Sequence, residues 1–255
     1  MVKRFKITFP SHDEFTERTA YIYLPSSYNK TKRKRYPVLY MFDGHNVFFD
    51  EDATYGKSWG MKDYMDRTKT QMIIAAVECN HSPNNGRLEE YSPFSFNDPS
   101  FGIVVGRGKN TMEWFVNVFK PFVDKKYRTL RDREHTFIAG SSMGGLMSVY
   151  ALLEYNHVFS RAAALSPSLW VSPEQIRNLI TQTPLDPDTI LYMDYGSDEF
   201  GNHTNLKRAF GEIATHMMRR NIMLDCRIVP GGTHCEACWE RQLPFFMHTL
   251  QYRYK

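Results

Sequence analysis

The chain has 255 residues, of which 42% are hydrophobic and 24% are charged, and its formal net charge is +4. These values are typical of a soluble globular protein. No stretch of about 18 apolar residues is present, which excludes a helix that spans a bilayer. We expect one domain over residues 1–255.

The first half of the chain predicts four strands and one helix. The alternating segments Lys3–Phe9 and Arg18–Leu24 predict an antiparallel hairpin. Nearly continuous apolar runs at Tyr36–Phe42 and Gln71–Val77 predict strands that are buried on both faces. A helix is expected between them, at Lys57–Asp66.

The middle of the chain begins with an irregular stretch. Residues Cys79–Gly108 are rich in Asn, Pro, Gly, Ser and Phe, and a structureless segment of that length is usually functional or a lid. Thr111–Lys126 has apolar residues at helical spacing, so we expect a helix that Pro121 kinks or divides.

The second half alternates between short apolar runs and helical patterns. Strands are expected at Phe137–Ala139, Phe159–Leu165, Thr189–Tyr195 and Ile222–Val229, and helices at Leu146–Leu153, Pro173–Ile180, Leu206–Arg219 and Glu236–Tyr252. This alternation predicts an α/β fold with a mostly parallel sheet, helices on both faces and the antiparallel hairpin at its start.

The basic run Lys30–Arg35 precedes the strand at Tyr36–Phe42. A nucleic-acid or membrane patch is one interpretation, but a solvated hairpin loop is the more common structure there. We expect a small-molecule partner, neither nucleic acid nor a membrane, and leave open whether copies of the chain associate.

Four cysteines, Cys79, Cys226, Cys235 and Cys238, are too few for a disulfide framework at this length. Reduced thiols are usual in the cytoplasm, where we expect the protein. Cys235 and Cys238 follow His234 and resemble a metal or redox motif, but zinc needs four ligands and no second pair has similar spacing. We expect no metal and no organic cofactor.

The segment from Gly140 to Gly144 reads G-S-S-M-G and fits the pattern G-x-S-x-G between a predicted strand and a predicted helix. In that context the central residue, Ser142, occupies a sharp turn that projects its side chain above the sheet. A Ser/Gly-rich loop that merely begins a helix is the alternative. The flanking strand and helix favour a nucleophile.

A serine nucleophile needs a base, and the base needs an orienting acid. His234 follows a late strand and is preceded by Gly231 and Gly232, which permit a sharp turn. Asp198 and Glu199 are adjacent at the end of the preceding strand, and periodicity does not choose between them. The order Ser, acid, His is that of the α/β hydrolases.

An oxyanion formed at the serine needs two backbone N–H donors. Met143, the residue after the nucleophile, supplies one. The loop after the Tyr36–Phe42 strand is expected to supply the other, from His45 or Asn46, although Asp43 and Gly44 also favour a simple turn.

Several segments, in this order, resemble the putative esterase family of α/β hydrolases. They are Tyr36–Met41 with Asp43 and Gly44, Arg87 with Glu90–Pro93, Phe119–Thr129, Ala139–Gly145, Ser166–Trp170, Tyr195–Glu199 and Gly231–His234. That family includes esterase D-like enzymes, carbohydrate and feruloyl esterases, siderophore esterases and mycolyltransferases.

The resemblance implies an α/β-hydrolase fold with Ser142 as nucleophile and His234 as base. In its closer members the acid follows a glycine by three positions, which here is Glu199, and Asp198 is the alternative. Loop position suggests that Trp170, a substrate-binding candidate, lies near the substrate mouth with Tyr91 and Phe94.

The sequence therefore predicts a serine carboxylesterase that hydrolyses small acyl esters through an acyl-enzyme, with acetyl or feruloyl esters of carbohydrates as candidate substrates. Two alternatives stay open. The same triad can transfer the acyl group to an alcohol, or the fold can serve as a binding protein with an idle site.

Overall fold

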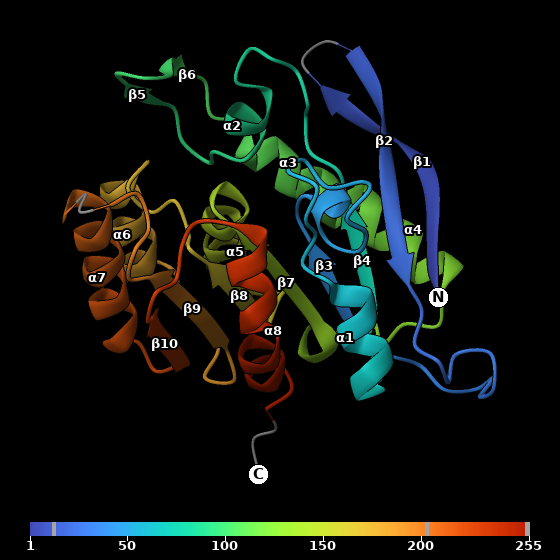
Figure 1. Cartoon of the computed structure of the whole chain (residues 1–255). Helices are drawn as coiled ribbons and strands as arrows, with labels where there is room; N and C mark the ends of the chain where they lie inside the picture. Colours follow the sequence, from blue (N-terminus) through green and yellow to red (C-terminus); the bar gives the residue numbers. More distant parts are fainter. Residues whose placement is uncertain (12–13, 202–203, 253–255) are drawn as a thin grey trace.

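The computed structural model describes residues 1–11, 14–201 and 204–252. Within these residues, eight strands form one sheet in the order β1-β2-β4-β3-β7-β8-β9-β10 (Figure 1). β1 pairs antiparallel with β2, and β2 antiparallel with β4, whereas the remaining neighbours are parallel. The predicted α/β-hydrolase fold with its N-terminal hairpin is confirmed, although part of the predicted hairpin turn, His12 and Asp13, lies outside the described residues.

The strands of the large sheet are β1 Val2–Ser11, β2 Glu14–Tyr23, β3 Val38–Met41, β4 Ile73–Val77, β7 Thr136–Ser141, β8 Arg161–Leu165, β9 Ile190–Gly196 and β10 Met223–Val229. The helices are α1 Met61–Thr68, α2 Gly86–Glu90, α3 Gly108–Trp114, α4 Lys120–Lys126, α5 Met143–Glu154, α6 Pro173–Gln182, α7 Thr204–Met218 and α8 Glu236–Leu250. Short 3-10 helices occupy Gly44–Asn46 and Arg133–His135.

The two faces of the sheet pack against different helices (Figure 1). In β3, Val38 and Tyr40 join the core beneath α3 to α7, whereas Leu39 and Met41 join the core beneath α1 and α8. Successive side chains of a strand point to opposite faces, so a strand covered on both sides must be apolar throughout. This explains the continuous apolar run of β3.

The segment Cys79–Gly108 is not structureless, which corrects the sequence interpretation. It contains α2 and a separate two-stranded hairpin formed by β5 (Phe96–Asp98) and β6 (Gly102–Val104). The sequence did not predict these elements, because the segment is rich in turn-forming residues and elements of three to five residues leave almost no periodic signal.

The predicted division of the helix at Thr111–Lys126 takes a specific form. α3 continues through a π-helical segment, Phe115–Phe119, into α4, and Pro121 lies in the first turn of α4. Proline has no backbone N–H to donate to the preceding turn, which accounts for the irregular hydrogen bonding just before it.

The basic run Lys30–Arg35 is exposed throughout, as expected for a solvated loop. It is not a hairpin loop, because it joins β2 to β3 and β4 lies between them in the sheet. None of the helices in the described part of the chain has the length and apolar character needed to cross a membrane.

Candidate active site

The parallel strands bring the predicted site residues to one edge of the sheet. Ser142 follows β7, Glu199 follows β9 and His234 follows β10, each in the loop at the carboxyl end of its strand. Parallel strands present these ends at the same edge, where ligands of open α/β sheets bind. Topology therefore assembles residues that lie up to 92 positions apart (142 to 234).

Ser142 occupies a strained turn between β7 and α5. Its backbone has φ 57° and ψ −122°, a region that residues other than glycine rarely adopt. The turn is compact: a Cβ on Gly140 would lie 2.6 Å from the carbonyl carbon of Gly144. The Ser142 N–H donates to the Leu165 carbonyl at 2.9 Å, which fixes the turn to β8.

Glu199, and not Asp198, contacts His234. The Nδ1 atom of His234 lies 2.9 Å from Oε2 of Glu199, which is only 1% exposed, whereas Asp198 points into solvent. The loops after β9 and β10 approach closely at two glycines, since a Cβ on Gly196 would lie 2.3 Å from the Gly232 carbonyl oxygen. This close approach allows the two loops to bring the carboxylate and the imidazole together.

The second oxygen of Glu199 is also held. Oε1 accepts hydrogen bonds from the Gly196 N–H at 2.8 Å and from the Ser166 hydroxyl. The Ser166 oxygen in turn accepts a hydrogen bond from Nε1 of Trp239 at 2.9 Å. A buried carboxylate needs such partners, and this chain of donors fixes the orientation of Glu199.

Ser142 and His234 face the same cavity without a direct bond. The Oγ atom of Ser142 lies 3.4 Å from Oγ of Ser168, and no hydrogen bond among the described residues joins it to His234. Two aromatic rings lie beside the imidazole: Phe200 is tilted against it at 4.4 Å and Trp239 is edge-on at 5.1 Å between ring centroids. With Nδ1 engaged by Glu199, Nε2 is left for the serine.

The loop after β3 offers one backbone donor, and the start of α5 offers another. Met143 is the first residue of α5, whose initial N–H groups have no partner within the helix. The Asn46 N–H already donates to the Asp43 carbonyl at 2.8 Å, whereas the described hydrogen bonds leave the His45 N–H unused. His45 is therefore the freer donor of the two that the sequence left open.

The same loop is held in place by Asp43, which adopts a left-handed conformation with φ 53°. Arg87 of α2 donates to both of its carboxylate oxygens, at 2.8 and 2.7 Å, and the Asp43 N–H donates to the Tyr91 hydroxyl at 3.2 Å. Burial raises the pKa of Asp43, but the charge and hydrogen bonds of Arg87 outweigh it and lower the pKa below its ordinary value.

A cavity of about 560 Å³ contains Ser142, His234, Phe200 and His45 among its lining residues. This volume lies within the usual range of small-molecule sites. Trp170 does not line it. The Trp170 ring instead packs edge-on against Phe96 of the β5–β6 hairpin at 6.3 Å, so the cavity gives no support to its predicted role in substrate binding.

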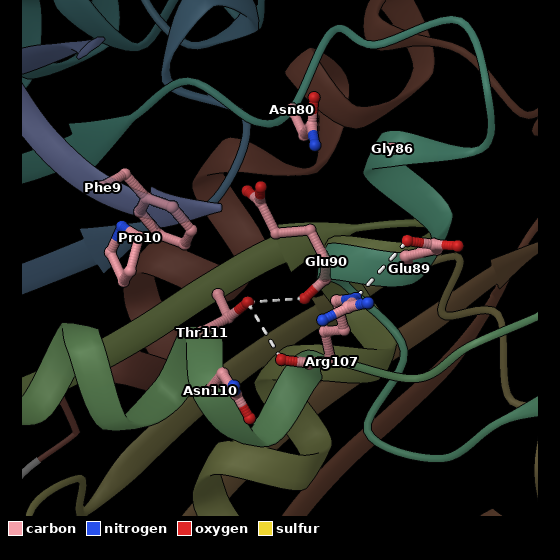
Figure 2. Close-up of a pocket in the computed structure, with 9 residues that line it drawn as sticks. All are labelled: Phe9, Pro10, Asn80, Gly86, Glu89, Glu90, Arg107, Asn110 and Thr111. Atoms are coloured by element: carbon pink, nitrogen blue, oxygen red, sulfur yellow. Dashed lines mark hydrogen bonds and ion pairs between the residues drawn. The ribbon is translucent and has the colours of Figure 1, made fainter. Parts of the chain in front are cut away.

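A second, smaller hollow of about 70 Å³ lies between β1, α2 and α3 (Figure 2). The carboxylate of Glu90 projects into it and pairs with Arg18 at 3.1 Å, while the Thr111 hydroxyl donates to the Glu90 carbonyl at 2.7 Å. Its lining residues include no histidine, serine or cysteine. The Glu90 carboxylate and the Thr111 hydroxyl are already engaged in these contacts, whereas the larger cavity contains both Ser142 and His234 and is the candidate active site.

The fold and the arrangement of serine, histidine and carboxylate define an α/β hydrolase. The family described as "Putative esterase" matches residues 15–248, so the chain belongs to that family and is a carboxylic ester hydrolase.

Two curated relatives are each 26% identical. One is the uncharacterized protein YbbA of Bacillus subtilis, with 78% of this chain and 73% of that protein aligned. The other is an endo-1,4-beta-xylanase/feruloyl esterase of Xylanibacter ruminicola, with 80% of this chain and 26% of that protein aligned.

Solved structures share the fold. A ferulic acid esterase has a TM-score of 0.70 at 22% identity, with 98% of each chain covered. The siderophore hydrolase EstA from Aspergillus nidulans has a TM-score of 0.73 at 16% identity, covering 98% of this chain and 94% of that chain.

The sequence interpretation missed four contributors to the site: Ser166, Ser168, Trp239 and Asp43. The segment Ser166–Trp170 resembles the esterase family and contains the substrate-binding candidate Trp170, but the sequence assigns no role to its two serines, and at Asp43 it favours only a turn. Ser166, Ser168 and Asp43 lie just after strands, which is the available signal, whereas Trp239 lies inside α8. The partner of each lies far away in sequence.

Proposed function

We propose that the protein is a serine carboxylesterase in which Ser142, His234 and Glu199 form the catalytic triad. The observation that carries this proposal is the contact of a buried Glu199 with His234 in the cavity that also contains the strained Ser142. Strain of this kind is typical of the nucleophile turn in α/β hydrolases.

The reaction has two halves. The Ser142 oxygen attacks the ester carbonyl while Nε2 of His234 takes its proton, and Glu199 stabilises the imidazolium without being protonated itself. The proton then passes to the leaving alcohol, and water cleaves the acyl-enzyme with His234 again as base. Ser142 must rotate from Ser168 toward His234, as expected for catalytic hydrogen bonds that tighten only with substrate bound.

The N–H groups of Met143 and His45 are the proposed oxyanion donors. Both belong to rigid surroundings, the start of the buried helix α5 and the loop that Arg87 holds through Asp43. Donors fixed before the reaction stabilise the developing charge without reorganisation.

The proposed substrates are acetyl or feruloyl esters of carbohydrates. The cavity volume and its aromatic wall at Phe200 and Trp239 suit an acyl or phenolic group. The xylanase/feruloyl esterase relative and the ferulic acid esterase structure support the feruloyl arm of this proposal.

The test is an ester panel of acetyl, butyryl, feruloyl and acetylated-sugar substrates, assayed with wild type, Ser142→Ala and Ser141→Ala. Ser142→Ala should lower kcat by roughly 10⁶. Ser141→Ala removes the neighbouring hydroxyl and should stay within about tenfold. A fluorophosphonate probe should label wild type at Ser142, and an unlabelled protein with no hydrolysis would identify a binding protein with an idle site.

A further inference from the structure

Three side chains with metal-binding atoms meet at one wall of the active-site cavity: His45, Cys79 and His81. A ring nitrogen of each histidine and the sulfur of Cys79 all lie within 4.8 Å of one another. His45 follows β3, and the other two follow β4, the neighbouring parallel strand. The proposed reaction uses none of these three side chains.

The His45 ring has an unused nitrogen. The residue is 5% exposed, its Nε2 lies 3.0 Å from the Thr54 hydroxyl, and its buried Nδ1 has no hydrogen-bond partner. Buried polar atoms are almost always paired, so an unpaired one needs a ligand to explain it. Burial is the main cause that lowers the pKa of His45 below its ordinary value.

Cys79 and His81 complete the group from one short stretch. Cys79 is a buried free thiol, and the exposed His81 ring packs edge-on against the His45 ring at 4.6 Å. Nε2 of His81 lies 3.8 Å from a carboxylate oxygen of Glu78. A carboxylate behind a histidine is a common way to orient a metal ligand.

We propose that Nδ1 of His45, Sγ of Cys79 and a ring nitrogen of His81 bind a divalent transition cation of the zinc class, with the fourth position open to water. Mixed nitrogen and sulfur donors suit such borderline-soft cations. Bonds of roughly 2.0 to 2.3 Å require the ligand atoms to approach by about 1 Å, which the exposed His81 can provide. On binding, the Cys79 S–H bond breaks, its proton leaves to solvent and a sulfur–metal bond forms.

The consequence for the enzyme rests on the proposed function. The cation lies in the cavity that Ser142 lines and binds the ring of His45. The backbone N–H of the same residue is the proposed oxyanion donor. Occupancy narrows the cavity and shifts that donor, so Zn²⁺ at this position inhibits ester hydrolysis reversibly.

The site is tested first without any activity measurement, by titrating the protein with Co²⁺ and recording its absorption. One equivalent should give a thiolate-to-cobalt charge-transfer band that Zn²⁺ displaces. Cys79→Ser should abolish the band and His81→Ala should weaken Co²⁺ binding at least tenfold, while His248→Ala, an exposed histidine on α8, leaves both unchanged. The other cluster among the described residues, Asp132, Glu134 and His135, has no sulfur and cannot produce this band.

Absence of the band in folded wild type, or its persistence in Cys79→Ser, would overturn the site. In the activity arm, Zn²⁺ should inhibit wild type and a chelator should restore it, whereas His81→Ala, compared with its own metal-free rate, resists Zn²⁺ at least tenfold better. Full activity with the site loaded would overturn the inhibition. Lack of hydrolysis in metal-free wild type would refute the proposed function alone, because the cobalt band does not depend on turnover.

Discussion

The guanidinium of Arg87 donates two hydrogen bonds, of 2.8 and 2.7 Å, to the carboxylate of Asp43, which lies 44 positions away in the sequence. The pair connects α2, in the long segment after β4, to the loop that carries the proposed oxyanion donor. Asp43 is buried and backbone-strained, so it depends on this partner more than a surface carboxylate would.

Arg87→Met should therefore lower both stability and turnover. Leaving a buried carboxylate without its partner costs about 3 kcal/mol of unfolding free energy, and displacement of the loop should reduce kcat by roughly tenfold or more. Urea unfolding and steady-state kinetics measure the two effects. Arg107→Met is the control, because its pair with Glu89 is longer, 3.5 Å, and partly exposed; equal effects in the two variants would contradict the argument.

Replacement of the two adjacent acids should separate their roles. Glu199→Gln loses the charge that stabilises the His234 imidazolium and should lower kcat by about 10⁴. Asp198→Asn changes an exposed side chain and should stay within about twofold. If Asp198→Asn were the more damaging change, the assignment of the triad acid would be wrong.

Trp239→Phe should act on catalysis through Ser166 and Glu199. Loss of the indole N–H removes one hydrogen bond worth about 1 kcal/mol, and the loosened carboxylate should lower kcat severalfold. Trp114→Phe is matched, since it removes a similar bond to the Thr8 carbonyl far from the cavity. That control should lose stability alone.

A glycine-to-alanine substitution should have opposite effects on stability at Gly140 and Gly211. A Cβ on Gly140 would meet the backbone of Gly144 at 2.6 Å, whereas one on Gly211 in α7 would meet nothing within 4 Å. Gly140→Ala should destabilise the protein by at least about 2 kcal/mol and abolish activity. Gly211→Ala should stabilise it by up to about 1 kcal/mol. Thermal unfolding of both variants decides the matter.

Asp194 should make stability depend on pH. It is 1% exposed, and burial raises its pKa to about 7. Because the folded state then binds the proton more tightly than the unfolded state, this group's contribution is greatest below its ordinary pKa of 3.8 and is lost as the pH rises to about 7.

Asp194→Asn removes this dependence. Between pH 5 and pH 8, wild type should lose roughly 1 to 3 kcal/mol more unfolding free energy than the variant. Urea denaturation of both proteins at the two pH values provides the comparison, and taking the difference cancels any constant cost of the substitution. Parallel curves would show that Asp194 is not protonated in the folded protein at pH 5.

The sequence by itself determined the chain order of the eight strands of the large sheet, the hairpin and the turn at Ser142, but not α2, β5 and β6. These features depend on local periodicity and on glycines next to a strand end, which act over a few residues. It could not choose between Asp198 and Glu199, because adjacent residues on one turn differ only in the direction they face. It could not rank His45 above Asn46, because the Asn46 N–H is used by a turn that only the folded loop shows.

Tertiary structure alone decided the longer-range relationships. Arg87 meets Asp43, Trp239 supports Glu199 through Ser166, and Trp170 turns toward the β5–β6 hairpin instead of the cavity. Each depends on which loops the sheet order places side by side. That order is set by packing of the whole core, and no local pattern encodes it.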